Sequence, residues 1–237
     1  MDTIDWNSFW NNYRTLESET ERDLFFQVGK TVNKEPVSEA VFNAAFEDIV
    51  NSLLIKPTDI VLEMCCGNGL VTFPLSQITK RIYAFDFVPH LIEAAKKFKQ
   101  NDTIEYKVGD AKADFFNLFS LVQIPNKYLM NDALGYFTPM ELTQILTYIM
   151  ENVPRFSFYL TGIPNDALKW NFYNTDERKQ TYLKGVEIGD ESNNGMGKWW
   201  KKAELLEIAE ALDLKITLKN QIQDISNYRM DVLFEKQ

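Results

Sequence analysis

The pattern of apolar and polar positions divides the chain at about residue 58. Before that point, apolar side chains recur with the period of a helix. Four aromatic residues follow the spacing i, i+3, i+4, i+7: Trp6, Phe9, Trp10 and Tyr13. A second helical pattern runs through "PVSEAVFNAAFEDIVNSLL", with Ser38 placed to cap it and Pro57 to end the segment. We therefore predict that residues 1–57 form a helical unit.

From residue 58 onwards, short apolar runs alternate with amphipathic segments. The predicted strands are "DIVLEM", "RIYAFDF", "IEYKVGD", "KYLMND" and "FSFYLTGIP". The predicted helices between them are "LVTFPLSQI", "PHLIEAAKKFKQ", "DFFNLFSLV" and "PMELTQILTYIMEN". This alternation is typical of βαβ units, which give a parallel sheet with helices on both faces.

Residues 165–200 interrupt the alternation. This segment is rich in aromatic and charged residues and is too long for a tight connection, so we expect an insert or cap there. After it, a helical pattern, "KKAELLEIAEALDL", leads into two more predicted strands, "KITLKNQI" and "YRMDVLFEK". The fold class is thus α/β, with a mostly parallel sheet of seven strands and an insert after the fifth strand.

Composition and charge narrow the class of protein. The chain has 237 residues, of which 45% are hydrophobic, and a formal net charge of −9. Such a balance argues against nucleic acid as the main partner, because phosphate binding depends on Lys and Arg. No apolar run approaches the roughly 20 residues of a membrane helix, and the acidic start does not resemble a secretory signal. We expect a cytoplasmic protein that does not bind a membrane.

The two cysteines, Cys65 and Cys66, are neighbours in the sequence. Adjacent cysteines rarely form a disulfide with each other and make a poor zinc site, so we predict no metal centre. Their simplest interpretation is as small buried residues in a reducing compartment.

The stretch "DIVLEMCCGNGLVTF" carries the first functional signal. An apolar strand ends at the acid Glu63, and Gly67 and Gly69 follow it. Glycines allow positive φ and a close approach of backbone to ligand, and the next helix points its N–H groups at the loop. Ligands of open parallel sheets bind at such carboxyl ends of strands. A nucleotide or nucleoside cofactor is therefore expected here.

Two more acids end the following predicted strands. Asp86 ends "IYAFD", where a carboxylate can accept both hydroxyls of a ribose. Asp110 ends "YKVGD", and the backbone N–H of its neighbour Ala111 is placed for an adenine ring. Phe87 follows Asp86 and can pack on that ring or in the core. A pyrophosphate beside Glu63 is unfavourable, whereas a ligand with an amino group and a sulfonium is favoured, which indicates S-adenosylmethionine (SAM) rather than NAD.

In these motifs the chain resembles the class I SAM-dependent methyltransferases. Their acid-x-Gly-x-Gly-x-Gly loop is similar to "EMCCGNG", with Cys65 in place of the first glycine. The family's ribose acid corresponds to Asp86, and its adenine motif to Asp110 and Ala111. The resemblance covers about residues 58–237, including the antiparallel last strand. It implies an enzyme that uses SAM and releases S-adenosylhomocysteine (SAH). The cofactor-binding residues that we expect are Glu63, Cys65, Gly67, Gly69, Asp86, Phe87, Asp110, Ala111 and Asn131.

The same resemblance indicates where the methyl acceptor binds. The segment after the fourth strand, "NDALGYF", implies catalytic roles for Asn131 and Asp132 and a substrate wall at Tyr136 and Phe137, although a helix cap or core packing explains these residues equally well. Direct displacement requires a base only if the acceptor must lose a proton, and Asp132 is our candidate. His90, the single histidine, lies on the cofactor side and is a weaker candidate.

Aromatic residues elsewhere are candidates to close the site. Tyr13 and its helix are expected to form a lid or to pack in the core, and Trp170, Tyr173 and Trp199 of the insert to line a substrate pocket. We expect Lys30 to meet the cofactor carboxylate if the N-terminal unit folds over it. The segment "FFQVGKTVN" resembles an N-terminal stretch of small bacterial methyltransferases, some encoded near surface-polysaccharide or modified-sugar genes. A small molecule, such as a sugar or a polysaccharide precursor, is therefore the expected acceptor, at O or N.

The sequence leaves two further functions open. One is a SAM-binding regulatory or partner subunit without turnover, because the catalytic group is the weakest assignment. The other is a nucleotide-dependent oxidoreductase, which Glu63 and the incomplete G-x-G-x-x-G pattern disfavour.

Overall fold

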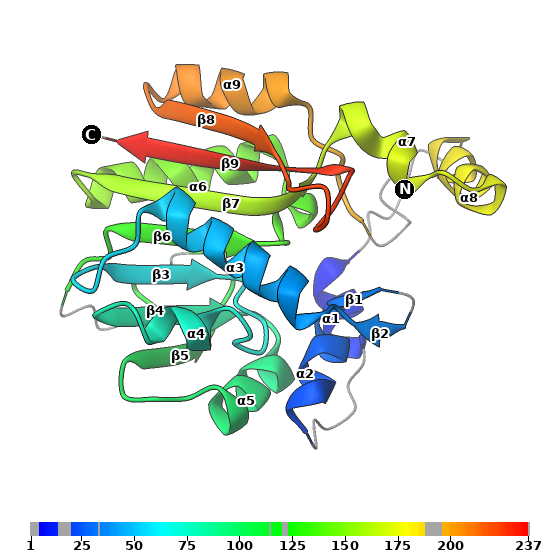
Figure 1. The fold of residues 1–237 in the computed structure, drawn as a ribbon. Coiled ribbons are helices and arrows are strands. Elements are labelled where there is room, and N and C mark those ends of the chain that lie inside the picture. The colour runs from blue at the N-terminus through cyan, green and yellow to red at the C-terminus, as the bar shows by residue number, and fades with distance from the viewer. Residues whose placement is uncertain are drawn as a thin grey trace.

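A single seven-stranded sheet forms the centre of the protein in the computed structural model, which describes residues 5–13, 20–32, 34–113, 115–119, 123–187 and 196–236 (Figure 1). Its strands are β3 (Ile60–Met64), β4 (Arg81–Asp86), β5 (Ile104–Val108), β6 (Lys127–Asn131), β7 (Phe156–Pro164), β8 (Lys215–Asn220) and β9 (Arg229–Lys236). Each coincides with a run that the sequence predicts as a strand, so the α/β fold class is confirmed.

The sheet has the order β5-β4-β3-β6-β7-β9-β8. The pairs from β5 to β7 are parallel, and β9 runs antiparallel to both β7 and β8. Going along the chain, the sheet grows from β3 to one side and then returns to add β6 on the other. The carboxyl ends of β3 and β6 therefore form the switch point at which ligands of such sheets bind.

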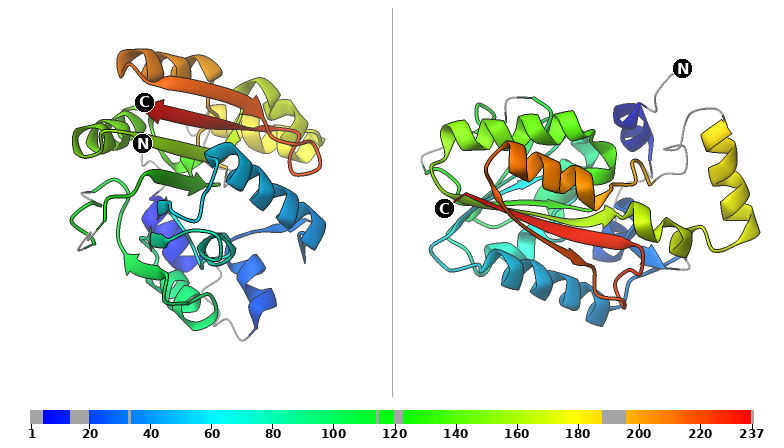
Figure 2. Two further views of the ribbon diagram at one scale, coloured as in Figure 1. Left: turned by 60° about the vertical axis from the view of Figure 1, so that its left-hand side comes forward. Right: turned by 90° about the horizontal axis from the view of Figure 1, so that it is seen from above.

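Helices cover both faces of the sheet (Figure 2). One face carries α3 (Glu39–Leu53), α4 (Thr72–Ser76) and α5 (Pro89–Phe98), and the other carries α6 (Pro139–Asn152) and α9 (Lys202–Ala211). The expected cap of α3 is present, because the Ser38 hydroxyl accepts the N–H of Val41 at 3.3 Å. Each face therefore encloses an apolar layer that fixes the strands between the two helix layers.

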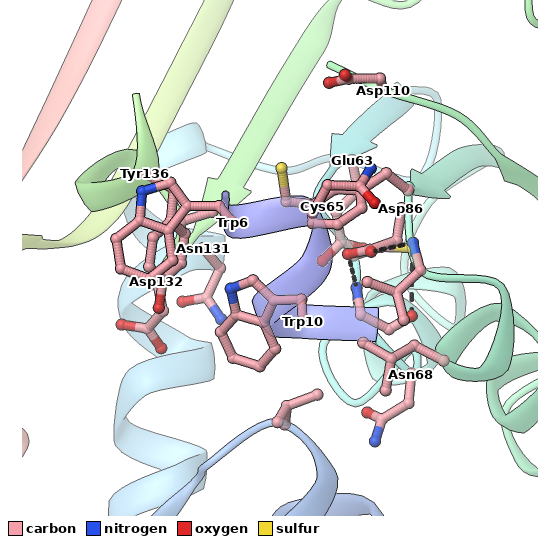
Figure 3. Close-up of a pocket in the computed structure, with 18 of the residues that line it drawn as sticks. Trp6, Trp10, Glu63, Cys65, Asn68, Asp86, Asp110, Asn131, Asp132 and Tyr136 are labelled. Atoms are coloured by element: carbon pink, nitrogen blue, oxygen red, sulfur yellow. Dashed lines mark hydrogen bonds between the residues drawn. The ribbon is translucent and has the colours of Figure 1, made fainter. Parts of the chain in front are cut away.

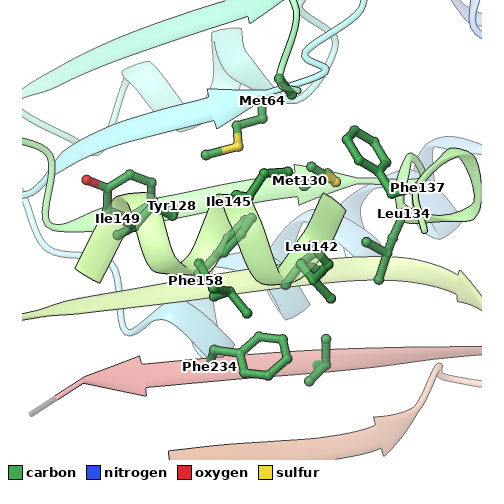
Figure 4. Close-up of a cluster of buried hydrophobic side chains, with 14 of the residues drawn as sticks. Met64, Tyr128, Met130, Leu134, Phe137, Leu142, Ile145, Ile149, Phe158 and Phe234 are labelled. Atoms are coloured by element: carbon green, nitrogen blue, oxygen red, sulfur yellow. The ribbon is translucent and has the colours of Figure 1, made fainter. Parts of the chain in front are cut away.

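The larger core lies between α6 and the sheet (Figure 4). Leu142, Ile145 and Ile149 of α6 recur on one helical face and are almost fully buried against the sheet. A capping box starts the helix: Thr138 accepts the N–H of Glu141 at 3.2 Å, and the Glu141 carboxylate accepts the N–H of Thr138 at 2.7 Å. Directly before it, the short 3-10 helix η1 (Leu134–Tyr136) leads away from the end of β6.

The N-terminal unit is only partly helical. It contains α1 (Trp6–Asn12) and α2 (Glu21–Gln27), but a small hairpin of β1 (Thr31–Val32) and β2 (Glu35–Pro36) precedes α3. The expectation of helix throughout residues 1–57 was therefore wrong for this stretch. Gly29, with φ of 67°, turns the chain after α2, and Pro36 cannot supply a helical N–H. The division of the chain at residue 57 remains a prediction.

A second difference lies between β5 and β6. The amphipathic segment 114–122 is predicted as a helix, but its described part, residues 115–119, forms turns. Phe115 and Phe119 are both buried and contact the ring of Phe85 at centroid distances of 6.0 and 6.2 Å. Their apolar spacing thus reflects packing of a turn against the sheet.

The insert after β7 forms a small layer of its own. It contains η2 (Asp166–Leu168), α7 (Lys169–Phe172) and α8 (Asp176–Glu187), while residues 188–195 lie outside the described part. Figure 1 shows α7 and α8 beyond the end of the sheet, away from the C-terminus. In the described ranges, no helix combines the length and the apolar character needed to cross a membrane.

Candidate active site

The glycine loop follows β3 at the switch point of the sheet. Three of its residues have positive φ: Cys65 at 56°, Gly67 at 55° and Gly69 at 78°. A Cβ on Gly69 would overlap the Tyr106 hydroxyl. Both the positive φ and the lack of room for a Cβ therefore require glycine at position 69. Cys65, by contrast, adopts a left-handed conformation despite its side chain.

Asp86 holds this loop in place from the end of β4. Its carboxylate accepts the N–H of Gly67 and the N–H of Val88, each at 2.9 Å. Burial raises the pKa of Asp86 to about 6, although both backbone bonds oppose the rise. The carboxylate thus lies at the cavity wall, fixed by the backbone of two loops.

Glu63 has a buried oxygen without a hydrogen-bond partner in the described part of the chain. Only 2% of the residue is exposed, and its Oε2 atom has no hydrogen-bond partner among the described residues. Burial raises the pKa of Glu63 to about 8; the Thr72 side chain opposes this rise, and the charge of nearby Asp86 adds to it. A buried oxygen without a partner is costly, so Oε2 is placed to accept a bond from a ligand.

Asp132, directly after β6, lies between two cations. Its carboxylate pairs with the Lys30 ammonium through one oxygen and with the Arg229 guanidinium through the other. Burial alone would raise the pKa of Asp132, but the two cations outweigh it and hold the pKa below its ordinary value. We call Lys30, Asp132 and Arg229 the ionic triad.

The bulge in β7 makes room for this triad. Gly162 has φ of 75°, and a Cβ there would overlap the Asp132 carboxylate. Asp231 of β9 fixes the bulge, because one of its oxygens accepts both the Gly162 N–H and the Thr161 hydroxyl at 2.8 Å. The position of Asp132 is therefore determined from β6, β7 and β9 together.

Helix α1 covers the open end of the site with aromatic rings. Trp6 and Trp10 contact the Tyr136 ring at centroid distances of 4.6 and 5.7 Å. Asp5 caps α1 by accepting the N–H groups of Asn7 and Ser8. We call Trp6, Trp10 and Tyr136 the aromatic roof; Figure 3 shows it beside Asn131 and Asp132, opposite Asp86.

These groups enclose one cavity of about 490 Å³. It extends from the glycine loop, Glu63, Asp86 and Asp110 to Asn131, Asp132 and the aromatic roof. Its volume lies within the usual range for small-molecule sites, about 300–1,000 Å³. The carboxylates at one end and the ionic triad with the roof at the other give the cavity two chemically different halves.

Comparison with known proteins identifies the domain that carries this cavity. Residues 61–151 match the methyltransferase domain family. These residues therefore carry a methyltransferase domain. The match includes the glycine loop, Asp86, Asp110 and the segment after β6, so the resemblance in those motifs is confirmed for the domain.

Solved structures share the fold over nearly the whole chain. The magnesium protoporphyrin IX methyltransferase from Synechocystis, solved with SAH, is 13% identical and has a TM-score of 0.61; the match covers 91% of this chain and 98% of that one. DhpI, solved with SAM and HEP, is 14% identical with a TM-score of 0.60; the match covers 96% and 94%. At such identities, these likenesses establish the fold.

One curated relative is more similar in sequence over a shorter stretch. A 23S rRNA uracil C5-methyltransferase from Polynucleobacter necessarius is 30% identical over 112 residues, which are 46% of this chain. The match spans only about a fifth of that relative, 22% of its length. It therefore supports the methyltransferase domain but not the activity of the whole protein.

Within the methyltransferase domain, the structure brings most of the predicted cofactor residues to the cavity. The lining includes Glu63, Cys65, Gly67, Asp86, Phe87, Asp110 and Asn131. Gly69 and Ala111 are not part of the lining, and Asp110 is exposed. Gly69 instead shapes the loop, at a place where an added Cβ would overlap the Tyr106 hydroxyl. The binding roles themselves remain predictions.

The predicted substrate residues divide into two groups. Tyr136 and Phe137 line the cavity. Tyr13 does not line it; its ring stacks on Phe9 at 5.4 Å and meets Trp10 edge-on at 5.0 Å. The structure does not place Trp170, Tyr173 or Trp199 at the cavity, contrary to expectation. Tyr173 and Trp199 are instead buried in a cluster with Tyr182. The Trp199 indole N–H donates to the Tyr173 hydroxyl at 3.2 Å, so the rings of the insert pack and hydrogen-bond with one another.

Several residues of the site escaped the sequence analysis. Arg229 and Asp231 lie in an ordinary-looking last strand, and Gly162 in an apolar run. An interrupted strand pattern around Gly162 is the one signal that could have indicated a bulge. Lys112, which also lines the cavity, pairs with Glu141 at 2.9 Å. His90 lies outside the lining, in agreement with its weak candidacy.

Proposed function

We propose that this protein is a SAM-dependent methyltransferase that transfers a methyl group to an O or N atom of a small molecule. One observation carries the proposal: the glycine loop of a matched methyltransferase domain borders a cavity of about 490 Å³ that is flanked by Glu63 and Asp86. The matched domain supports donor binding at this loop, and the cavity's second half supplies space for an acceptor.

The residues present fit the cofactor. The unpartnered Glu63 oxygen suits the amino group of a methionine moiety, because an ammonium would restore the charged form of that carboxyl group. Asp86 suits a ribose diol, and Phe87 and Leu91 supply apolar surface for a base. When bound, SAM supplies an electrophilic methyl group. The chain's own task is to bind and orient the acceptor and to exclude water from it.

A small acceptor is supported by the size of the cavity and by the cover that α1 gives it. The aromatic roof lies beside Asn131 and Asp132, so α1 narrows the access of a duplex or a folded RNA to this half of the cavity. Two of the structural neighbours act on or bind small molecules by their names, a magnesium protoporphyrin and HEP. A sugar or polysaccharide precursor also remains a proposal, without further support from the cavity.

An RNA acceptor is the second candidate, because the relative matched over 112 residues is an rRNA methyltransferase. The net charge of −9 disfavours it, since phosphate contacts require an excess of cations. A SAM-binding subunit without turnover is a third candidate, which a measured methyl transfer would exclude. A nucleotide-dependent oxidoreductase is a fourth, and the family of the domain disfavours it.

Calorimetric titration with SAM, SAH and NAD tests the proposal. We expect SAM and SAH to bind with micromolar dissociation constants, about −8 kcal/mol, and NAD to give no heat. Binding of NAD without binding of SAM or SAH would contradict the methyltransferase proposal. Labelled methyl transfer to a small-molecule extract but not to total RNA then separates the two acceptor classes.

A further inference from the structure

The acceptor half of the cavity offers no side chain suited to remove a proton at neutral pH among the described residues. Asp132 is held by two cations that lower its pKa, and burial raises the pKa of Tyr136 to about 12. Burial likewise raises the pKa of the Cys65 thiol. Asp5 uses its carboxylate to cap α1. This half of the cavity is therefore poorly suited to an acceptor that must lose a proton to a side-chain base.

Within the same half of the cavity, the excess of positive charge lies at the ionic triad, whereas Asp5, the other acid of this half, is exposed at the start of α1. The ionic triad contains two cations and one anion, so its formal charge is +1. Its side chains are largely buried, with exposed fractions of 26% for Lys30 and 23% each for Asp132 and Arg229. In addition, the Nε of Arg229 is buried with no hydrogen-bond partner in the described part of the chain. A buried excess charge next to a cavity favours a ligand of opposite sign.

We propose that the methyl acceptor is an oxyanion, most simply a carboxylate, that binds beside Lys30 under the aromatic roof and leaves as a methyl ester. This inference rests on the proposed function and names the acceptor class of the same site. Lys30 lines the cavity and would contact the oxyanion, while Arg229, which does not line it, supplies charge from behind Asp132.

The chemistry balances without a base. A lone pair of the acceptor oxygen forms the new O–C bond while the C–S bond of the methyl donor breaks and its electron pair goes to sulfur. The negative charge of the oxyanion and the positive charge of the sulfonium cancel, and no proton is released. A hydroxyl or an ammonium acceptor would have to lose one proton, and the described residues in this half of the cavity include no group suited to take it.

Lys30 has a competing assignment, namely the carboxylate of the cofactor. The two assignments predict different effects on binding when Arg229 or Asp132 is replaced by a neutral residue. If the triad serves the acceptor, changing its charge alters binding of an acceptor-like anion and leaves SAH affinity within about twofold. If it serves the cofactor, the same changes alter SAH affinity instead.

The test uses three probes of similar shape: benzoate, benzyl alcohol and benzylamine. Each is titrated into the full chain loaded with SAH, and binding is followed by saturation-transfer NMR. We expect benzoate to bind at least tenfold more tightly than the other two, and to weaken as salt is raised. Equal binding of the three, absence of binding, or a preference for benzylamine would overturn the oxyanion assignment.

Charge variants of opposite sign sharpen the test. Arg229→Met reduces the triad from +1 to 0 and should weaken benzoate binding at least fivefold. Asp132→Asn raises it to +2 and should leave binding equal or tighter, whereas a base or a cation-binding role for Asp132 predicts a loss. Lys215→Met, which removes a cation paired with Glu235 at the sheet edge, is the matched control and should change nothing.

Failure of the inference and of the proposed function are separable. Absence of SAH binding in the wild-type chain counts against the proposed function. SAH binding without a preference for benzoate counts against the oxyanion alone.

Discussion

The Asp132 carboxylate pairs with Lys30, a residue 102 positions earlier in the chain. The contact joins the end of β6, inside the methyltransferase domain, to the segment that follows α2. Because Arg229 of β9 holds the other oxygen of Asp132, three distant parts of the sequence meet at one carboxylate. This carboxylate therefore serves as a structural anchor as well as a candidate site residue.

Asp132→Ala should lower the free energy of unfolding by roughly 2–4 kcal/mol, because it leaves two largely buried cations without a partner. Urea denaturation measures this change. The control is Glu235→Ala, which breaks the more exposed pair with Lys215 and should cost less than about 1 kcal/mol. Similar costs for the two variants would show that the triad is not a structural anchor.

Cofactor binding should release up to about one proton at pH 7. Glu63, with a pKa of about 8 in the free protein, is mostly protonated at that pH, and an ammonium ligand favours its ionised form. Calorimetry in buffers of different ionisation enthalpy counts the protons. Glu63→Gln has no proton to lose and should bind SAH more weakly with less proton release; an unchanged proton count would contradict the assignment.

The same group predicts how stability depends on pH without ligand. The pKa of Glu63 rises from 4.5 to about 8 on folding, so between these values the unfolded chain binds fewer protons than the folded one. Glu63 therefore makes the free energy of unfolding fall as pH rises through this window. Comparing thermal unfolding of the wild type and Glu63→Gln at pH 5 and pH 8 should show a smaller fall in the variant.

Gly69→Ala should destabilise the protein by roughly 1–3 kcal/mol and weaken SAH binding, because its Cβ meets the Tyr106 hydroxyl at a positive φ. Gly29→Ala is a matched control: its φ is also positive, at 67°, but the nearest atom, the Tyr13 hydroxyl, is 3.5 Å from the added Cβ. Adding Tyr106→Phe should recover part of the loss at Gly69. If it recovers nothing, backbone strain alone accounts for the effect.

Binding of SAH should slow hydrogen exchange in residues 5–13 if α1 acts as a lid, because ordering of the roof raises its opening free energy. Tyr136→Ala removes the ring that Trp6 and Trp10 contact and should speed this exchange with and without ligand. The variant Trp199→Phe, in the separate aromatic cluster, should leave exchange in α1 unchanged. Equal exchange in α1 with and without SAH would make it a fixed wall.

The strands and the donor half of the site could be predicted because their signals are local. Glu63, Gly67 and Gly69 adjoin one strand, and Asp86 ends the next, so chain order alone brings them to one edge of a parallel sheet. The acceptor half depends on side chains that meet only after folding. Nothing near Arg229 in the sequence indicates that its side chain pairs with Asp132. The insert is as rich in aromatic residues as a pocket wall, but its rings pack on each other, and composition alone does not distinguish the two arrangements.

Asn68 shows that the family match and the folding unit have different limits. Its side-chain amide donates to the Leu24 carbonyl at 2.8 Å and to the Gln27 side chain at 3.0 Å, and all three residues are buried. Residues 61–151 alone would leave this amide without partners in the middle of the glycine loop. We therefore expect the loop and α2 to unfold together, and a fragment cut at residue 57 to keep its strands while the glycine loop loses its order.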